Sequence, residues 1–190
     1  MEFVAYDEVM GLLREHGVHE VADGEDRVCL ELTSDKDVVH LHLATENSEI
    51  VPREGASVLR VDTQCLAGAV EHIIHKLHLS QVLLIPVARW RNVFDAVAFS
   101  LAENEDWQAV DTAATVELNS RDPLLCEPGD FHTVNALMGA LLKDADRPEQ
   151  GLHVTTTAAP VMVRLEPDEA IRISLGNAVL ADQVVEAFSA

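Results

Sequence analysis

Apolar residues recur along this chain with two different periods, and the alternation of these periods constrains its fold more than any other feature. In five segments the apolar residues recur every three or four positions, which is the spacing of a helix with one buried stripe. These stripes begin at Tyr6, Leu66, Trp90, Phe131 and Leu180. Between them, apolar and polar residues alternate as in strands with one buried face. A helix with a single apolar stripe packs on a sheet rather than inside a bundle, so we expect both sheets and helices.

Residue types at the ends of these segments support the helix predictions. Gly17 follows the first stripe, where a helix that ends in the left-handed conformation favours glycine. Asp130 and Asn177 precede the fourth and fifth stripes, and both residue types favour the N-cap position. We therefore expect the first helix to end near Gly17, and the fourth and fifth to begin after these caps.

Short links between the alternating segments indicate antiparallel meanders. Residues 28–33 and 39–43 are separated by the turn-forming stretch 34–37, and residues 161–165 and 171–175 are separated by a similar link. We expect each pair to form a hairpin. The run 82–87 is continuously apolar, which is typical of a strand buried on both faces.

Together these patterns predict an α+β protein with antiparallel meander sheets covered by amphipathic helices. With 190 residues, the chain is long enough to bury a core as a single compact unit. A division into lobes 1–88 and 89–190 is the alternative. A helix followed by a hairpin occurs near both ends, and a weaker third copy runs from a helix at residue 90 into strands at 107–116. This indicates an internal duplication, although such patterns also recur by chance.

Composition excludes several classes of protein. The formal net charge is −20, and such a chain repels nucleic acid and anionic lipid. No apolar run approaches the roughly 20 residues that span a bilayer. Residues 1–8 are acidic and lack the basic region of a signal peptide, so we expect a cytoplasmic protein. Three cysteines at wide spacings argue against a disulfide framework and favour buried thiols.

From residue 90 onward the predicted order is helix, short strands, helix, strands, helix. This order resembles that of the class I type III secretion chaperones and related small helix–meander proteins. The resemblance covers about half of the chain and rests on element order and charge, without a shared motif. It implies an acidic, dimeric, non-enzymatic binding protein.

The predicted hairpin 28–43 carries the first group of candidate site residues. If its apolar residues share one face, the other face places Glu31 opposite His40 and Cys29 opposite His42. A carboxylate, a thiol and two imidazoles in one patch could bind a divalent transition metal. The structural alternative is a polar sheet face that is solvated or covered by a partner.

A second group lies on the helix that begins near Leu66. His72 and His75 lie away from its apolar stripe, so they face solvent or bind a metal together. Their spacing of three residues differs from the spacing of four in zinc-binding helices, which favours an ordinary exposed face.

A third candidate is Arg89-Trp90-Arg91, directly after the apolar run 82–87. Two guanidinium groups around an indole could bind a carboxylate or phosphate beyond the end of a parallel strand. Alternatively, Trp90 only begins an apolar stripe while the arginines pair with nearby acids. Arg164 and Arg172 are also expected to be neighbours, on the outer face of the last hairpin, with Glu166 and Glu169 close enough to neutralise them.

The chain contains no phosphate-binding loop, nucleophile elbow or metalloprotease motif. We therefore expect a non-enzymatic binding or interaction protein, homo-oligomeric, with a protein partner and without a cofactor. The alternatives are a metal-binding protein or metal-dependent enzyme that uses these histidines, and a binder of small anionic ligands.

Overall fold

A computed structural model of the chain describes residues 1–22, 26–33, 37–45, 55–61, 66–114, 118–167 and 171–188. Its centre is an eight-stranded sheet. The strands are β1 (Glu2–Phe3), β4 (Val39–Thr45), β5 (Ala56–Val61), β6 (Val82–Pro86), β7 (Leu124–Cys126), β8 (Leu152–Thr155), β9 (Val161–Leu165) and β10 (Ile171–Leu175). Their order is β1-β7-β6-β8-β9-β10-β4-β5. Neighbouring strands are antiparallel, except that β4 and β5 are parallel.

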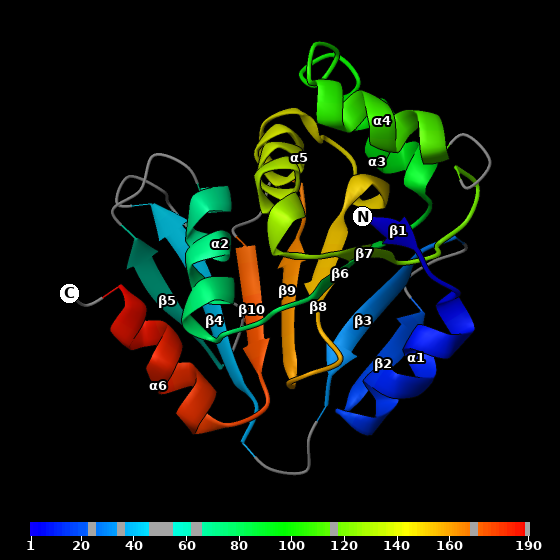
Figure 1. Cartoon of the computed structure of the whole chain (residues 1–190). Coiled ribbons are helices and arrows are strands. Elements are labelled where there is room, and N and C mark those ends of the chain that lie inside the picture. The colour runs from blue at the N-terminus through cyan, green and yellow to red at the C-terminus, as the bar shows by residue number, and fades with distance from the viewer. Residues whose placement is uncertain are drawn as a thin grey trace.

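Helices cover one face of this sheet (Figure 1). They are α2 (Leu66–Lys76), α3 (Trp90–Val97), α5 (Phe131–Asp144) and α6 (Ala178–Ala187), with α4 (Glu105–Ala114) against α5 and short 3-10 turns at Pro128–Asp130 and Pro148–Gln150. Leu84, Val163 and Ile173 of the sheet and Leu137 of α5 belong to the larger core. None of the helices described is long and apolar enough to cross a bilayer.

A smaller unit packs on part of the opposite face. It consists of α1 (Tyr6–Glu15) and a separate two-stranded sheet of β2 (Val18–Ala22) and β3 (Val28–Leu32). Its core includes Leu83 and Ile85 of β6, whereas Leu84 faces the helices. Strand β6 is therefore buried on both faces, as its continuous apolar run predicts. Figure 1 shows this unit at the right of the view, whereas β4 and β5 lie at the left.

The α+β class and its antiparallel sheets covered by helices are confirmed. Helix α1 ends at Glu15, and Gly17 follows with a φ of 82°, a conformation that favours glycine. Asn177 caps α6, because its side chain accepts a hydrogen bond from the backbone N–H of Leu180 at 3.0 Å. Strands β9 and β10 form the predicted hairpin, in which Arg164 lies directly opposite Arg172.

The predicted hairpin 28–43 is wrong. Strand β3 pairs with β2, and β4 lies between β10 and β5 in the large sheet. The period of apolar residues determines which face of a strand is buried, but it says nothing about which strand is the neighbour. Because β3 and β4 belong to different sheets, the two ends of the chain differ in topology, and an internal duplication is not shown.

Three further expectations need correction. The sequence predicts strands at 107–116, but the chain is helical (α4) as far as Ala114. Trp107 and Val110 are both buried and are three residues apart, which is a helical spacing. Helix α5 begins directly after Asp130, as predicted, but the side chain of Asp130 does not cap it and instead accepts hydrogen bonds from the N–H of Glu127 and from the N-terminal amine of Met1. Strand β6 is antiparallel to both neighbours, so a site beyond a parallel strand end is not formed there.

Strands from the segments 1–88 and 89–190 alternate within the one large sheet. β4 and β5 lie beside β10, and β1 lies beside β7. The two segments therefore share a sheet and a core.

Candidate functional site

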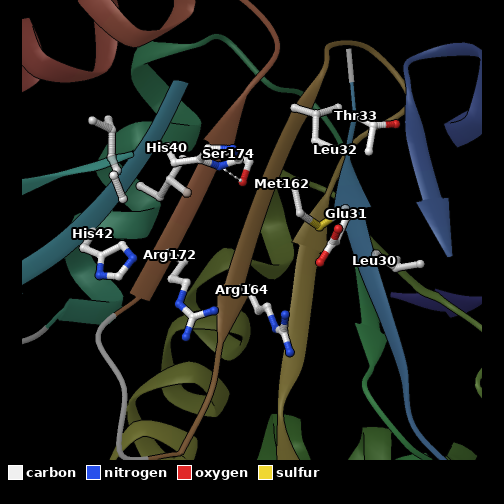
Figure 2. Close-up of a pocket in the computed structure, with 13 residues that line it drawn as sticks. Leu30, Glu31, Leu32, Thr33, His40, His42, Met162, Arg164, Arg172 and Ser174 are labelled. Atoms are coloured by element: carbon white, nitrogen blue, oxygen red, sulfur yellow. Dashed lines mark hydrogen bonds between the residues drawn. The ribbon is translucent and has the colours of Figure 1, made fainter. Parts of the chain in front are cut away.

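A pocket of about 350 Å³ lies between β3 and the sheet face that the smaller unit leaves uncovered. Its floor comes from β9, β10 and β4, and its wall comes from β3, as Figure 2 shows. A pocket of this size is within the range of about 300–1,000 Å³ in which proteins bind small molecules.

The register of the sheet aligns polar side chains in rows across this floor. His42 of β4 lies opposite Arg172 of β10, Arg172 opposite Arg164 of β9, and Arg164 opposite His153 of β8. Directly opposed residues of neighbouring strands point to the same face, so these four basic side chains form one row. Figure 2 shows His42, Arg172 and Arg164 side by side in this order.

Two like charges at directly opposed positions repel each other, and Glu166 offsets this repulsion. One carboxylate oxygen of Glu166 contacts Nη2 of Arg164, and the other lies 3.2 Å from Nη2 of Arg172. The three side chains are only 13–14% exposed, so water screens their charges weakly. One carboxylate thus bridges two guanidinium groups on neighbouring strands.

Two contacts hold β3 against the basic row. Nη2 of Arg164 lies 2.9 Å from Sγ of Cys29, and the backbone N–H of Leu30 donates to Nε2 of His153 at 3.2 Å. His153 is fully buried, and burial together with the positive charge of Arg164 lowers its pKa to about 3. Nε2 can accept a hydrogen bond only if the imidazole is neutral. The uncharged form of His153 therefore attaches the smaller unit to the sheet.

The rim of the pocket carries further polar groups. Nδ1 of His40 lies 2.9 Å from the hydroxyl oxygen of Ser174, directly opposite on β10. Glu31 of β3 is exposed, and Figure 2 shows its carboxylate on the wall, facing the pocket. The pocket thus combines a basic floor with an acidic group on one wall.

Three of the four site residues predicted on segment 28–43 line this pocket. Glu31, His40 and His42 meet there although β3 and β4 do not pair, because β3 packs over β9 and β10 and the pocket extends from β3 to β4. Cys29 adjoins the pocket through Arg164. His40 and Glu31 are exposed as expected, but Cys29 and His42 are buried, with 3% and 5% of their surface exposed. Within the described part of the chain, no three His, Cys, Asp or Glu side chains are grouped as metal ligands would be.

His72 and His75 lie on the exposed side of α2 and contact different neighbours. Nε2 of His72 lies 3.1 Å from the carbonyl oxygen of Ala187 at the end of α6, and its ring contacts Phe188. His75 instead packs edge-to-face on Phe131 of α5, and its Nε2 is 3.5 Å from a carboxylate oxygen of Glu71. These contacts give each histidine a role in helix packing.

Trp90 does not lie on the surface with Arg89 and Arg91, which are both exposed. Trp90 is fully buried, and its indole N–H donates to the carbonyl oxygen of Asp122 at 2.7 Å. Arg89 donates to the carbonyl oxygen of Asn119 at 2.6 Å, and Arg91 is exposed on α3. Trp90 is thus a core residue, as the structural alternative predicts.

Sequence reasoning noted Arg164 and Arg172 as neighbours with Glu166 close by, but it did not place a pocket on them. Glu169, the second acid expected near them, lies outside the described residues. His153 was missed, because a histidine between Leu152 and Val154 reads as the outward residue of an alternating pattern. Of the cysteines, Cys126 is a buried thiol whose pKa burial raises to about 12, and Cys65 lies outside the described residues.

Comparisons with protein-family models, with curated proteins and with solved structures gave no match to this chain. The resemblance to class I type III secretion chaperones therefore stays a prediction from element order. Any function has to be argued from the pocket itself.

Proposed function

We propose that this protein is a non-enzymatic binding protein and that the pocket beside β3 holds an anionic group of its ligand, a carboxylate or a phosphate. The observation that carries this proposal is the pair Arg164 and Arg172, which are opposed on neighbouring strands, share the carboxylate of Glu166 and both line the pocket. The anionic-ligand function is thereby assigned to these arginines instead of Arg89 and Arg91.

Physical chemistry favours an anion at this position. A hydrogen bond between charged groups contributes about 1.5–3 kcal/mol where water is largely excluded, and a guanidinium can make two with one carboxylate or phosphate. The net charge of −20 repels anions at a distance, but ionic strength screens that repulsion beyond about 8 Å. The two guanidinium groups that line the pocket can therefore determine binding once a ligand enters it.

The proposal predicts opposite effects for two substitutions in the cluster. Arg172→Gln removes one of the two guanidinium groups that line the pocket, so affinity for inorganic phosphate and acetate should fall about tenfold or more. Glu166→Gln leaves two guanidinium groups without a shared carboxylate, so affinity for the same anions should rise. Titrations followed by NMR chemical shifts suit the weak binding expected of such small probes.

Arg91→Gln is the matched control, because it removes an exposed arginine of α3 outside the pocket. It should leave anion affinity unchanged, and circular dichroism should show that all three variants are folded. Equal affinities in the wild type, Arg172→Gln and Glu166→Gln would mean that the arginine pair only stabilises the sheet, and the proposed function would be wrong.

Self-association and metal binding stay predictions of the sequence. Sedimentation velocity addresses the first, and elemental analysis of protein purified without chelator addresses the second.

A further inference from the structure

We infer that the ligand of this pocket is a small zwitterion, with its carboxylate on Arg172 and Arg164 and its ammonium group on Glu31. This inference rests on the proposed function, and it adds the charge pattern and chemical class of the ligand. It would make the protein a binder of amino acids or of similar amino-carboxylates.

The first argument is the separation of charge across the pocket. Arg164 and Arg172 lie on the floor, where Glu166 already pairs with both of them. Glu31 approaches from the opposite element, β3, and is exposed on the pocket wall (Figure 2). A ligand that extends from the floor to this wall meets positive groups at one end and a carboxylate at the other.

The second argument is the charge of the whole chain. With a net charge of −20, the protein repels mono- and dianions that come within the screening distance of about 8 Å, and this repulsion slows their association. A zwitterion has no net charge and escapes this penalty, yet its carboxylate still pairs with the arginines inside the pocket. A neutral, dipolar ligand therefore suits both the acidic molecule as a whole and the basic floor of the pocket.

The third argument is the size of the pocket and the position of its neutral groups. A volume of about 350 Å³ is near the lower end of the range for small-molecule sites, which suits a ligand of amino-acid or dipeptide size. Met162, Ser174 and His40 are directly opposed on β9, β10 and β4, so they form a second row beside the arginine row. The pocket therefore has both apolar and hydrogen-bonding surface for the remainder of such a ligand.

A homologous series of ligands tests the inference and measures the charge separation. The zwitterions are glycine, β-alanine, 4-aminobutanoate, 5-aminopentanoate and 6-aminohexanoate, together with the twenty L-amino acids. Acetate, propanoate, butanoate, pentanoate and hexanoate are the matched ligands without an amine. We expect at least one zwitterion to bind about tenfold or more tightly than its matched carboxylate, measured by calorimetry or NMR titration.

Glu31→Gln should abolish this preference and leave the affinity of the simple carboxylates unchanged or higher. Because Glu31 is exposed, this variant should fold, and Glu103→Gln, which removes an exposed carboxylate outside the pocket, is the matched control. The inference is overturned if every zwitterion binds no better than its matched carboxylate, or if the preference survives in Glu31→Gln. Failure of the proposed function has a different signature, in which neither phosphate nor any carboxylate responds to Arg172→Gln.

Discussion

At the scale of single residues, His153 has the most unusual environment in the candidate site. Its ring is fully buried, and its Nε2 accepts a hydrogen bond from the N–H of Leu30. Burial is the larger cause of its lowered pKa, and the adjacent charge of Arg164 is the second. Protonation would destroy the acceptor and place a second positive charge beside the guanidinium, so the folded protein resists it.

This histidine predicts a loss of stability in mild acid. Its pKa is about 3 in the folded protein and about 6.5 in an unfolded chain, so between these values the unfolded state binds a proton that the folded state does not. The free energy of unfolding should therefore fall as the pH is lowered from about 6.5 towards 3, by up to about 1.4 kcal/mol per pH unit from this group.

Other groups also titrate in this range, so the test compares two proteins. His153→Gln retains a side-chain acceptor for the N–H of Leu30 but does not titrate. In urea unfolding between pH 7 and pH 4.5, the stability of the wild type should decline more steeply than that of the variant. Parallel pH profiles would show that His153 does not set this dependence.

At the scale of elements, local chemistry determines where helices begin and end. Gly17 follows α1 in the left-handed conformation, where its backbone N–H bonds to the carbonyl oxygen of Arg14 at 3.0 Å. Asn177 begins α6 through its side-chain oxygen. Both positions were predictable, because these residue types meet a requirement of the adjacent backbone that does not depend on distant parts of the chain.

Removal of the α6 cap should have a modest, measurable cost. Asn177→Ala leaves the N–H of Leu180 without its side-chain acceptor and should lower the free energy of unfolding by about 1 kcal/mol. Asn177→Asp retains the acceptor and should stay within a few tenths of a kcal/mol of the wild type. Chemical denaturation measures both, and equal losses in the two variants would indicate that the cap bond is unimportant.

At the scale of the whole molecule, the large sheet has a core on each face, and only one of these cores supports a wall of the pocket. Leu137 of α5 belongs to the core beneath the helices, and Leu13 of α1 belongs to the core that holds β3 on the sheet. Only the second core positions a wall of the pocket, because α1 packs with β2 and β3.

Truncation of one leucine in each core separates stability from binding. Leu13→Ala and Leu137→Ala each remove a side chain that is at most 1% exposed, so each should lower the free energy of unfolding by about 2–5 kcal/mol. Leu13→Ala should also weaken ligand binding, because β3 loses support, whereas Leu137→Ala should leave affinity unchanged. Calorimetry at a temperature where both variants are folded is the measurement, and equal affinities would contradict a separate role for the smaller unit.

The sequence alone determined the class of fold and the face on which each candidate residue lies. His40 and His42 alternate with Leu41 and Leu43, and that period places them on the outer face of β4 whatever strand lies beside it. Glu31 is likewise turned away from the core side of β3. A period of two follows from the backbone of a strand, so it could be derived without knowledge of the neighbours.

Only the tertiary structure decided which residues meet. Arg172 lies beside His42 because β4 pairs with β10, a strand about 130 residues later. Strand β3 faces them across the pocket because it packs over β9 and β10 instead of pairing with β4. Pairing partners depend on the total burial and hydrogen bonding of the whole chain, which no local pattern contains. The pocket, its shared carboxylate and the buried His153 therefore became visible only when distant strands were side by side.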